Sequence, residues 1–506
     1  PANKVWGYVP DRGERIVAPT IPSEVITPNN PPTGWGILGD IYSRGWQRTD
    51  NTNNFLSFFA TFAYSFKNRY VVNANVRNDA SNVFGQDINH RIDPTYSFGL
   101  SWRASEEAFF QKHLKWITTL NFRGTFGIQG NALTRESPEL ILSQQGVQPG
   151  YNRYFSTIGQ IPNPYLSWER TRNWNFGVDL ELFRMFYMNL EYYTRRSNAV
   201  ITVDLPFEYG IDDMKRNGGI IYNRGIEYTL SFTPIQKRDF SLNINLNASK
   251  NWNKGGETKI DRNTAMYLRG GSTQILKEGY PLSAFWSYSF AGLDGSNGKP
   301  MFNYVEVPDE EKSKSIDPTT YLVYSGETEP YFTGGLGFSF RYKSLSLNTS
   351  FSLLLGSKKR LPSPYSDFQG SGSMMPDPTK NVNRDLLNRW QKPGDEVYTN
   401  IPGLPTWPIE IGWTLPNTDS AESAIEMWEK SDAMVVSGSF LRCRNIGLSW
   451  QMKKEWCDKI HAKNLAINFN MDNIFVIASK RFNGFDPELE NSIMPRSFSL
   501  GLNIGF

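Results

Sequence analysis

The chain has 506 residues and a nearly balanced charge, with 53 Lys and Arg against 50 Asp and Glu. This balance, without a basic stripe, gives no support for nucleic-acid binding, and no Pro-, Gly- or Ser-rich linker divides the chain into compact domains. The mean hydropathy of −0.48, without a run of about 18 apolar residues, excludes a helical membrane protein. A membrane barrel remains open because half of each of its strands is polar.

Residues 1–53 are rich in Pro, Gly, Asn and Trp and have no sustained periodicity, so they predict a long loop segment. From residue 54 onward, apolar and small polar side chains alternate with the period of two that is typical of β-strands. The first two strands, near 54–66 and 70–79, are joined at Lys67 and Asn68 and predict a hairpin.

The same alternation returns along the rest of the chain and predicts about fifteen strands connected as hairpins. The later strands are expected near 96–102, 116–126, 173–182, 188–192, 226–232, 240–247, 266–280, 283–294, 336–342, 345–353, 437–451, 464–476 and 496–506.

The last strand shows the pattern most clearly. Phe498, Leu500, Leu502 and Ile504 share one face, and the intervening positions are Ser, Gly and Asn. A strand of about 9–11 residues is long enough to cross a bilayer when it is tilted. We therefore expect the apolar face to meet lipid and the small polar face to line the interior.

The connections between these strands alternate in length. Short connections are expected at 67–68, near 184, at 234–239 and at 343–344, with two longer links on the same side at 105–115 and 452–463. Long connections are expected at 128–167, 198–220, 252–265, 295–329, 357–436 and 477–494. Short turns at one end and long loops at the other are typical of outer-membrane barrels. The fold prediction is an all-β, transmembrane antiparallel β-barrel rather than a soluble sandwich or propeller.

Several collinear segments resemble the SusC/RagA-type TonB-linked (TonB-dependent) outer-membrane transporters of Bacteroidetes. These segments are Asn68–Asp79, Ser105–Phe110, Gly127–Asn131, Asn163–Glu169, Asn223–Glu227, Arg389–Asp395, Phe440–Ile446, Gly484–Glu488 and Pro495–Phe506. The resemblance covers only the barrel of that family, so no TonB-box or plug residue can be carried over to this chain.

The resemblance implies a multi-pass protein of the cell outer membrane that actively imports large nutrients with energy from TonB. It also implies a SusD-like surface lipoprotein as partner. Oligosaccharides are the first expected ligand class and oligopeptides the alternative. A passive porin or an outer-membrane enzyme is the further alternative, but no catalytic motif supports an enzyme.

Strand parity gives an expectation about the rest of the barrel. A plugged transporter barrel has about 22 strands, so the roughly fifteen expected here leave about seven strands and the plug to another chain or to residues outside this one. If the last strand runs toward the periplasm, an odd number of strands makes the first strand of this chain run the same way, so residues 1–53 before it are expected outside the cell. Seven preceding strands that start from the periplasm would also end outside the cell. The barrel would span residues 54–506, with its largest extracellular loops at 128–167, 295–329 and 357–436.

The candidate ligand-binding residues are aromatic side chains of the longest loop: Tyr365, Trp390, Trp407 and Trp413, with Trp428 beside them. Such rings could stack on sugar rings or on peptide side chains. In the simpler interpretation they pack inside the loop or against a lid protein. The helical spacing from Asn381 to Trp390 is expected to brace the loop.

No cofactor and no catalytic residue are predicted. The two cysteines, Cys443 and Cys457, are expected to be unrelated thiols. Asp309–Glu311 and the pair Asp486 and Glu488 could bind surface calcium, but they lack EF-hand spacing and are expected to be solvated acidic loops.

Two further polar groups are expected to be structural. Asp294–Gly298 predicts a turn. Interior asparagines are expected to pack within the wall rather than to contact the plug or ligand; they are Asn243, Asn245, Asn247, Asn468 and Asn470.

Overall fold

The computed structural model describes residues 8–9, 14–15, 54–81, 92–131, 140–148, 153–205, 208, 210–211, 213–257, 265–270, 276–303, 318–365, 381–404, 424–489 and 492–506. The chain divides into two units, Pro1–Asn54 and Phe55–Phe506. In the first unit, β1 (Tyr8–Val9) and β2 (Glu14–Arg15) form an antiparallel pair. The loop predicted for 1–53 otherwise lies outside the described residues.

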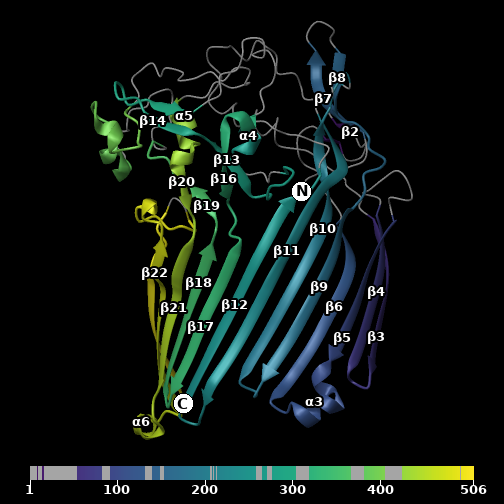
Figure 1. Cartoon of the computed structure of the whole chain (residues 1–506), viewed down its shortest axis with the longest axis vertical. Coiled ribbons are helices and arrows are strands. Elements are labelled where there is room, and N and C mark those ends of the chain that lie inside the picture. Colours follow the sequence, from purple (N-terminus) through teal and green to yellow (C-terminus); the bar gives the residue numbers. More distant parts are fainter. Residues whose placement is uncertain are drawn as a thin grey trace. The chain divides into compact units, whose positions relative to one another are not determined.

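The second unit is built on one 13-stranded sheet. Each strand of this sheet pairs with the next strand of the same sheet along the chain. All of these pairs are antiparallel, as the hairpin pattern predicted (Figure 1). The strands are β3 (Phe55–Phe66), β4 (Tyr70–Ser81), β5 (Ile92–Arg103), β6 (Ile117–Asn131), β9 (Glu169–Leu182), β10 (Phe186–Asp204), β11 (Asp213–Gln236), β12 (Phe240–Gly255), β17 (Phe332–Tyr342), β18 (Leu345–Leu355), β21 (Phe440–Gln451), β22 (Asn464–Ala478) and β23 (Ser497–Gly505).

The count of about fifteen strands was too high because two predicted strands belong to a loop. Near residues 266–280 the structure has the short helix α4 (Ala265–Leu268). Residues 283–294 form β13 (Ala284–Tyr288) and β14 (Phe290–Leu293), which pair with β16 (Leu322–Glu327) and β15 (Pro300–Phe302) in two small separate sheets. Thirteen is also odd, so β3 and β23 run in the same direction, as the larger count predicted.

The alternation of short and long connections is confirmed. One end of the sheet carries the turns 67–69, 183–185, 237–239 and 343–344. The same end carries two links with short helices: η2 (Ala104–Glu106) with α3 (Ala108–His113), and α6 (Lys454–Lys459). In the tight turns, Lys67 and Asn68 have φ of 51° and 55°, as the favoured two-residue hairpin turns require.

The other end carries the long connections, with two differences from the prediction. The connections expected at 252–265 and 295–329 are parts of one connection, from β12 to β17. The loop expected at 198–220 is mostly strand, because β10 continues to Asp204 and pairs with β11 from Asp213. Within the connection from β6 to β9, β7 (Ile141–Gln148) and β8 (Arg153–Gln160) form a further hairpin. Among the described residues, no helix is both long and apolar enough to cross a membrane.

The connections from β12 to β17 and from β18 to β21 pack into one loop body. Besides β13–β16 and α4, it contains η5 (Pro318–Thr320), β19 (Lys358–Arg360), η7 (Arg384–Asn388), η8 (Asp395–Val397), α5 (Ala424–Glu429), η9 (Asp432–Met434) and β20 (Val435–Ser437). Two buried apolar clusters hold it together, one around Trp286 and Met427 and the other around Trp428. Most of the conventional hydrophobic core of the described chain therefore lies in its loops.

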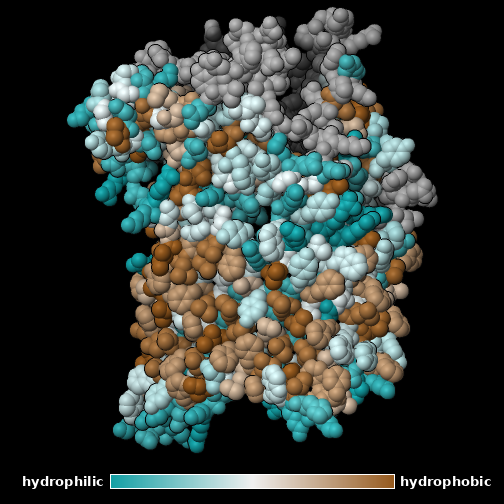
Figure 2. Space-filling view, in the orientation of Figure 1, coloured by the Kyte–Doolittle hydropathy of each residue, from teal (hydrophilic) through white to brown (hydrophobic). Residues whose placement is uncertain are grey.

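The sheet itself exposes apolar side chains on its outer face. Leu56, Trp174 and Leu500 are 57 %, 47 % and 77 % exposed. Figure 2 shows a hydrophobic band across the strands and hydrophilic side chains at both ends. A band of exposed apolar side chains is what a lipid-facing barrel wall requires.

An irregularity in β21 turns two arginines toward the last connection. The register between β21 and β22 shifts between Cys443 and Asn445, and such bulges re-aim side chains. Arg442 NH2 lies 2.7 Å from both carboxylate oxygens of Asp486. Its Nε lies 2.9 Å from Glu488 in an ionic contact without hydrogen-bond alignment, and Arg444 donates to Glu488 at 3.0 Å.

This cluster corrects the prediction for Asp486 and Glu488, which are not solvated acidic loop residues. Arg442 is 2 % and Asp486 5 % exposed, so this pair joins the last connection, which contains η10 (Lys480–Phe482), to the wall. Both carboxylates contact guanidinium groups. Asp309–Glu311 lie outside the described residues.

Arg442→Met is expected to destabilise the connection after β22 by about 3–5 kcal/mol, because it leaves the Asp486 carboxylate buried without its partner. Hydrogen exchange of residues 479–489 in lipid nanodiscs would measure this. Arg444→Met is the matched control and should cost about 0–1 kcal/mol, because Arg444 is 45 % exposed. The double variant Arg442→Met/Asp486→Leu should recover most of the loss. Equal effects of the two single variants would contradict the assignment.

Leu502→Arg is expected to destabilise the barrel by roughly 2–4 kcal/mol if Leu502 lies near the bilayer midplane. Unfolding in lipid vesicles would measure the loss, and Ser499→Arg on the opposite face is the control, with a smaller expected cost. Spin labels would test the same register independently. Stronger acyl-chain contact at Ser499 and Asn503 than at Leu500 and Leu502 would show that the faces are assigned the wrong way round.

Candidate functional site

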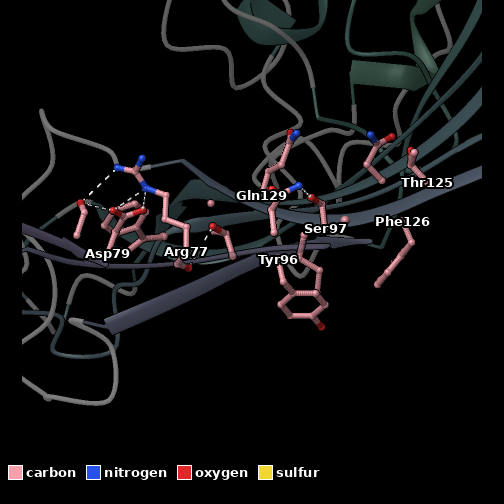
Figure 3. A pocket seen from close by; sticks show the side chains of 15 residues that line it. Arg77, Asp79, Tyr96, Ser97, Thr125, Phe126 and Gln129 are labelled. Atoms are coloured by element: carbon pink, nitrogen blue, oxygen red, sulfur yellow. Dashed lines mark hydrogen bonds and ion pairs between the residues drawn. The ribbon is translucent and has the colours of Figure 1, made fainter. Parts of the chain in front are cut away.

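A groove of about 850 Å³ lies on the inner face of the sheet. Its lining includes Tyr96, Phe126 and Trp168 and short polar side chains of β3, β4, β5, β6 and β9, among them Ser57, Asn75, Thr95, Ser97, Thr125, Gln129 and Asn173. Figure 3 shows Thr125 and Gln129 on one side of the sheet and Tyr96 and Phe126 pointing to the other. The strand alternation thus turns these hydrogen-bonding side chains toward the groove and the Tyr96 and Phe126 rings toward the opposite face.

One ion pair lies at the edge of this groove. Arg77 Nε donates to the two carboxylate oxygens of Asp79 at 2.8 and 2.7 Å, and the Ser57 hydroxyl donates to the same carboxylate. The Arg77 side chain is 57 % exposed and that of Asp79 13 %. The pair therefore offers guanidinium N–H groups to the groove while its net charge stays near zero.

A second charged group lies on the same face toward the short turns. Arg123 NH2 is 3.1 Å from Asp179 and 2.9 Å from Glu191. A Cβ on Gly177 would lie 3.1 Å from Arg123 NH2, so the glycine leaves room for the guanidinium to cross the neighbouring strand. The sequence analysis missed these charges, although they stand at the polar positions of strands that it recognised.

The inner face of β12 to β23 is rich in asparagine. Asn243 donates to Thr233 at 2.8 Å, and Asn245 donates to Asn243. Cβ atoms on Gly335 and Gly447 would lie 2.6 Å from Asn247 Oδ1 and 2.8 Å from Asn470 Oδ1. These four amides thus bond or pack within the wall, as predicted; Asn468 stands opposite Gly501 on β23.

The predicted loop aromatics have different positions. Tyr365 is 1 % exposed, donates its hydroxyl to the Pro402 carbonyl and packs edge-on against Trp428, which is also 1 % exposed. Both rings therefore pack inside the loop body, as the simpler interpretation expected, and do not present a ligand surface in this structure. Trp407 and Trp413 lie outside the described residues.

Trp390 is half-buried against a tight turn. Gly298 ends the predicted Asp294–Gly298 turn at a φ of 73°, and a Cβ there would lie 2.3 Å from the Trp390 ring. The Trp390 indole N–H donates to Glu396 at 3.0 Å. The amide of Glu396 itself and this indole hold the pKa of the Glu396 carboxyl below its usual range. Trp390 therefore braces the loop, and its ligand role stays a prediction.

The predicted bracing segment 381–390 contains η7 at Arg384–Asn388, in which only Leu386 is buried. The most exposed described loop aromatic is instead Tyr398, at 90 %, and Tyr324 and Tyr331 are each 45 % exposed. Sequence alone could not rank these rings, because their exposure depends on contacts between distant loops.

Arg360 joins the two connections of the loop body. It donates to the carbonyls of Arg269 and Trp286 at 2.6 Å each, and its guanidinium lies over the Phe285 ring. Burial, and to a smaller extent the neighbouring charge of Arg269, lowers the pKa of Arg360 to about 10. Arg360 stays cationic at neutral pH and acts as a structural tie.

No metal site is apparent where the structure is described: none of its His, Cys, Asp and Glu residues form a group of three or more suited to a metal ion. Cys443 and Cys457 are both buried and are not bonded to each other.

The hydrogen-bonding side chains of the groove on β3, β4, β5, β6 and β9 can bind a polar ligand along the inner wall.

Comparison with known proteins gives the family. The family model for "TonB dependent receptor-like, beta-barrel" matches residues 18–353. TonB-dependent receptor P3 of Formosa agariphila is 23 % identical, over 90 % of this chain and 46 % of the relative. TonB-dependent receptor SusC of Bacteroides thetaiotaomicron is 25 % identical, over 90 % of this chain and 44 % of the relative. The chain thus spans about half the length of the curated relatives it matches.

A solved structure shows the same fold. The RagAB peptide transporter superposes with a TM-score of 0.68 at 22 % identity, over 90 % of this chain and 48 % of that one. The family consists of transport receptors rather than enzymes, in line with the sequence-based expectation. The chain belongs to the TonB-dependent receptor-like β-barrel family, as a SusC/RagA-type protein of the outer membrane.

Proposed function

We propose that this chain provides barrel wall to a TonB-dependent importer of large nutrients, with oligosaccharides as the first ligand class. TonB supplies the energy, and a SusD-like surface lipoprotein is the partner at the extracellular loops. Further strands and a plug complete the barrel. The family match over residues 18–353 is the observation that carries the transport proposal.

The side chains of the inner wall favour the binding of a neutral, hydroxyl-rich ligand. A sugar hydroxyl both donates and accepts hydrogen bonds, and so do the Ser, Thr, Asn and Gln side chains of the groove. The Arg77 and Arg123 charges are paired with carboxylates, so the wall does not require an oppositely charged ligand. The exposed ring of Tyr398 could add stacking contact at the loops.

Oligopeptides are the second candidate class. The Arg77 guanidinium is more exposed than its Asp79 partner, so it could bind a peptide carboxylate in a charge-assisted hydrogen bond. RagAB, whose structure is similar, is a peptide transporter, but an identity of 22 % supports the shared fold and not a shared ligand.

Removing TonB from the host is expected to abolish growth on the cognate nutrient, because the ligand is too large to diffuse through an open pore. Uptake of labelled nutrient would be measured with and without TonB in otherwise identical cells. A complementing TonB copy is the control and should restore uptake. Uptake that persists without TonB would indicate a passive pore.

The variant Thr125→Val/Gln129→Ala is expected to weaken oligosaccharide binding about 30-fold, because the two lost hydrogen bonds cost on the order of 1 kcal/mol each. Calorimetry with the complete receptor complex would measure the affinity. Tyr192→Phe, on the outer face of β10 and outside the groove lining, is the matched control and should bind like the unmodified protein. If the unmodified complex binds oligopeptides but not oligosaccharides, and the groove variant loses that binding, then oligopeptides are the ligand class. The transport proposal would still stand in that case.

A further inference from the structure

Three arginines gather around a small cavity on β6, β9 and β10. The cavity measures about 130 Å³ and is lined by Ile128, Arg170, Arg172, Arg196 and Asn198. Arg172 stands directly between Ile128 and Arg196 in the sheet, and Arg170 stands opposite Asn198 in the next outward-facing row. Like charges in directly opposed positions destabilise a sheet unless something compensates them.

These arginines lie on the outer face of the wall. Arg170 and Arg172 alternate in phase with Trp174 and Phe176, which are 47 % and 51 % exposed. Arg196 is likewise in phase with Tyr192, which is 40 % exposed. Because side chains two residues apart share a face, the cavity opens on the side that carries the apolar band, away from the interior groove.

The cavity lies at the edge of that band nearest the long connections. β9 begins at Glu169 after a long connection, so Arg170 and Arg172 precede the aromatic residues toward that end. Just below them, the Phe126 and Trp174 rings lie 4.4 Å apart between centroids. Aromatic rings concentrate at membrane interfaces, so the guanidinium groups stand at the level of the lipid headgroups.

Two of the three arginine charges in this cavity, those of Arg172 and Arg196, have no carboxylate partner among the described residues. None of its five described lining residues is acidic, and within the described part of the chain Arg172 and Arg196 make no ion pair. Arg196 Nε is buried without a hydrogen-bond partner. Arg77, Arg123 and Arg442, which face the interior, all contact carboxylates.

We propose that this cavity binds the phosphate group of an anionic glycolipid in the outer leaflet of the outer membrane. Guanidinium groups match phosphate oxygens in paired hydrogen bonds. The small cavity suits one phosphate, and its position beside the apolar band lets the acyl chains of the same lipid lie on Trp174 and Phe176. A soluble nutrient has no reason to bind on this face.

The neighbouring strands extend the same arrangement. Arg196 pairs across the sheet with Tyr222, and Tyr222 pairs with Lys254. One row nearer the apolar band, the Arg224 guanidinium and the Lys250 ammonium lie 5.7 and 5.0 Å from the Trp252 ring centroid. A basic and aromatic border therefore continues from β9 to β12, as expected where anionic headgroups pack against the wall.

Binding would be tested on the complete receptor complex in nanodiscs by native mass spectrometry. The probes are phosphorylated lipid A, the same lipid after enzymatic dephosphorylation, and inorganic phosphate as a competitor. We expect the unmodified protein to bind the phosphorylated lipid at least about tenfold more tightly than the dephosphorylated one, because charge-assisted hydrogen bonds are lost with the phosphate. Inorganic phosphate at matched concentration should not displace it.

The variant Arg172→Gln/Arg196→Gln should lose that preference. Arg195→Gln is the matched control and should keep it, because Arg195 neighbours Arg196 on β10 but lies over Tyr193 on the opposite face. Equal binding of both lipids by the unmodified protein, or a double variant that keeps the preference, would overturn the proposal. Displacement by inorganic phosphate would also overturn it, in favour of a free-anion site. The lipid comparison decides the question even if the double variant fails to fold.

Discussion

The structure depends on the requirement that every backbone N–H and C=O inside a membrane find a partner in the protein, since lipid offers none. Between neighbours the 13 strands meet it by pairing in one antiparallel sheet, in which the edge strands β3 and β23 each pair on one side only. That pairing leaves each strand residue only two directions, toward lipid or toward the interior. The groove and the apolar band are therefore the two faces of the same backbone arrangement, and chemistry varies mainly at the inner face, at the borders of the band and in the loops.

Local exceptions to this regularity occur where charges must be placed. Gly177 leaves space for Arg123 to reach Asp179 and Glu191 across the strands. The register shift near Cys443 allows Arg442 to reach Asp486. In both cases the ordinary alternation would leave a large cation without room or without a partner, and a buried unpaired charge is costly. Small residues and bulges thus adapt a regular wall to polar contacts.

The sequence was sufficient for the strands because their period of two is a local property, visible in Phe498–Phe506 without any other part of the chain. It failed where a property depends on distant contacts. Ala284–Tyr288 is a strand, but its partner is β16 and all five residues are buried. Tyr365 became a ligand candidate because it is aromatic, yet Pro402 and Trp428 enclose it. Asp486 looked solvated because its partner Arg442 lies 44 residues away.

The presence or absence of a carboxylate partner distinguishes the roles of the arginines. Arg442 is almost completely buried and has a carboxylate at 2.7 Å, so its charge is satisfied by the fold and serves to hold a loop. Arg172 is exposed and Arg196 half-buried at the border of the apolar band, where the described residues supply neither of them with a carboxylate. A half-buried cation beside lipid is tolerated only with a compensating anion or with access to the interface. The outer wall therefore places its unpaired cations at the level where the membrane itself carries negative charge.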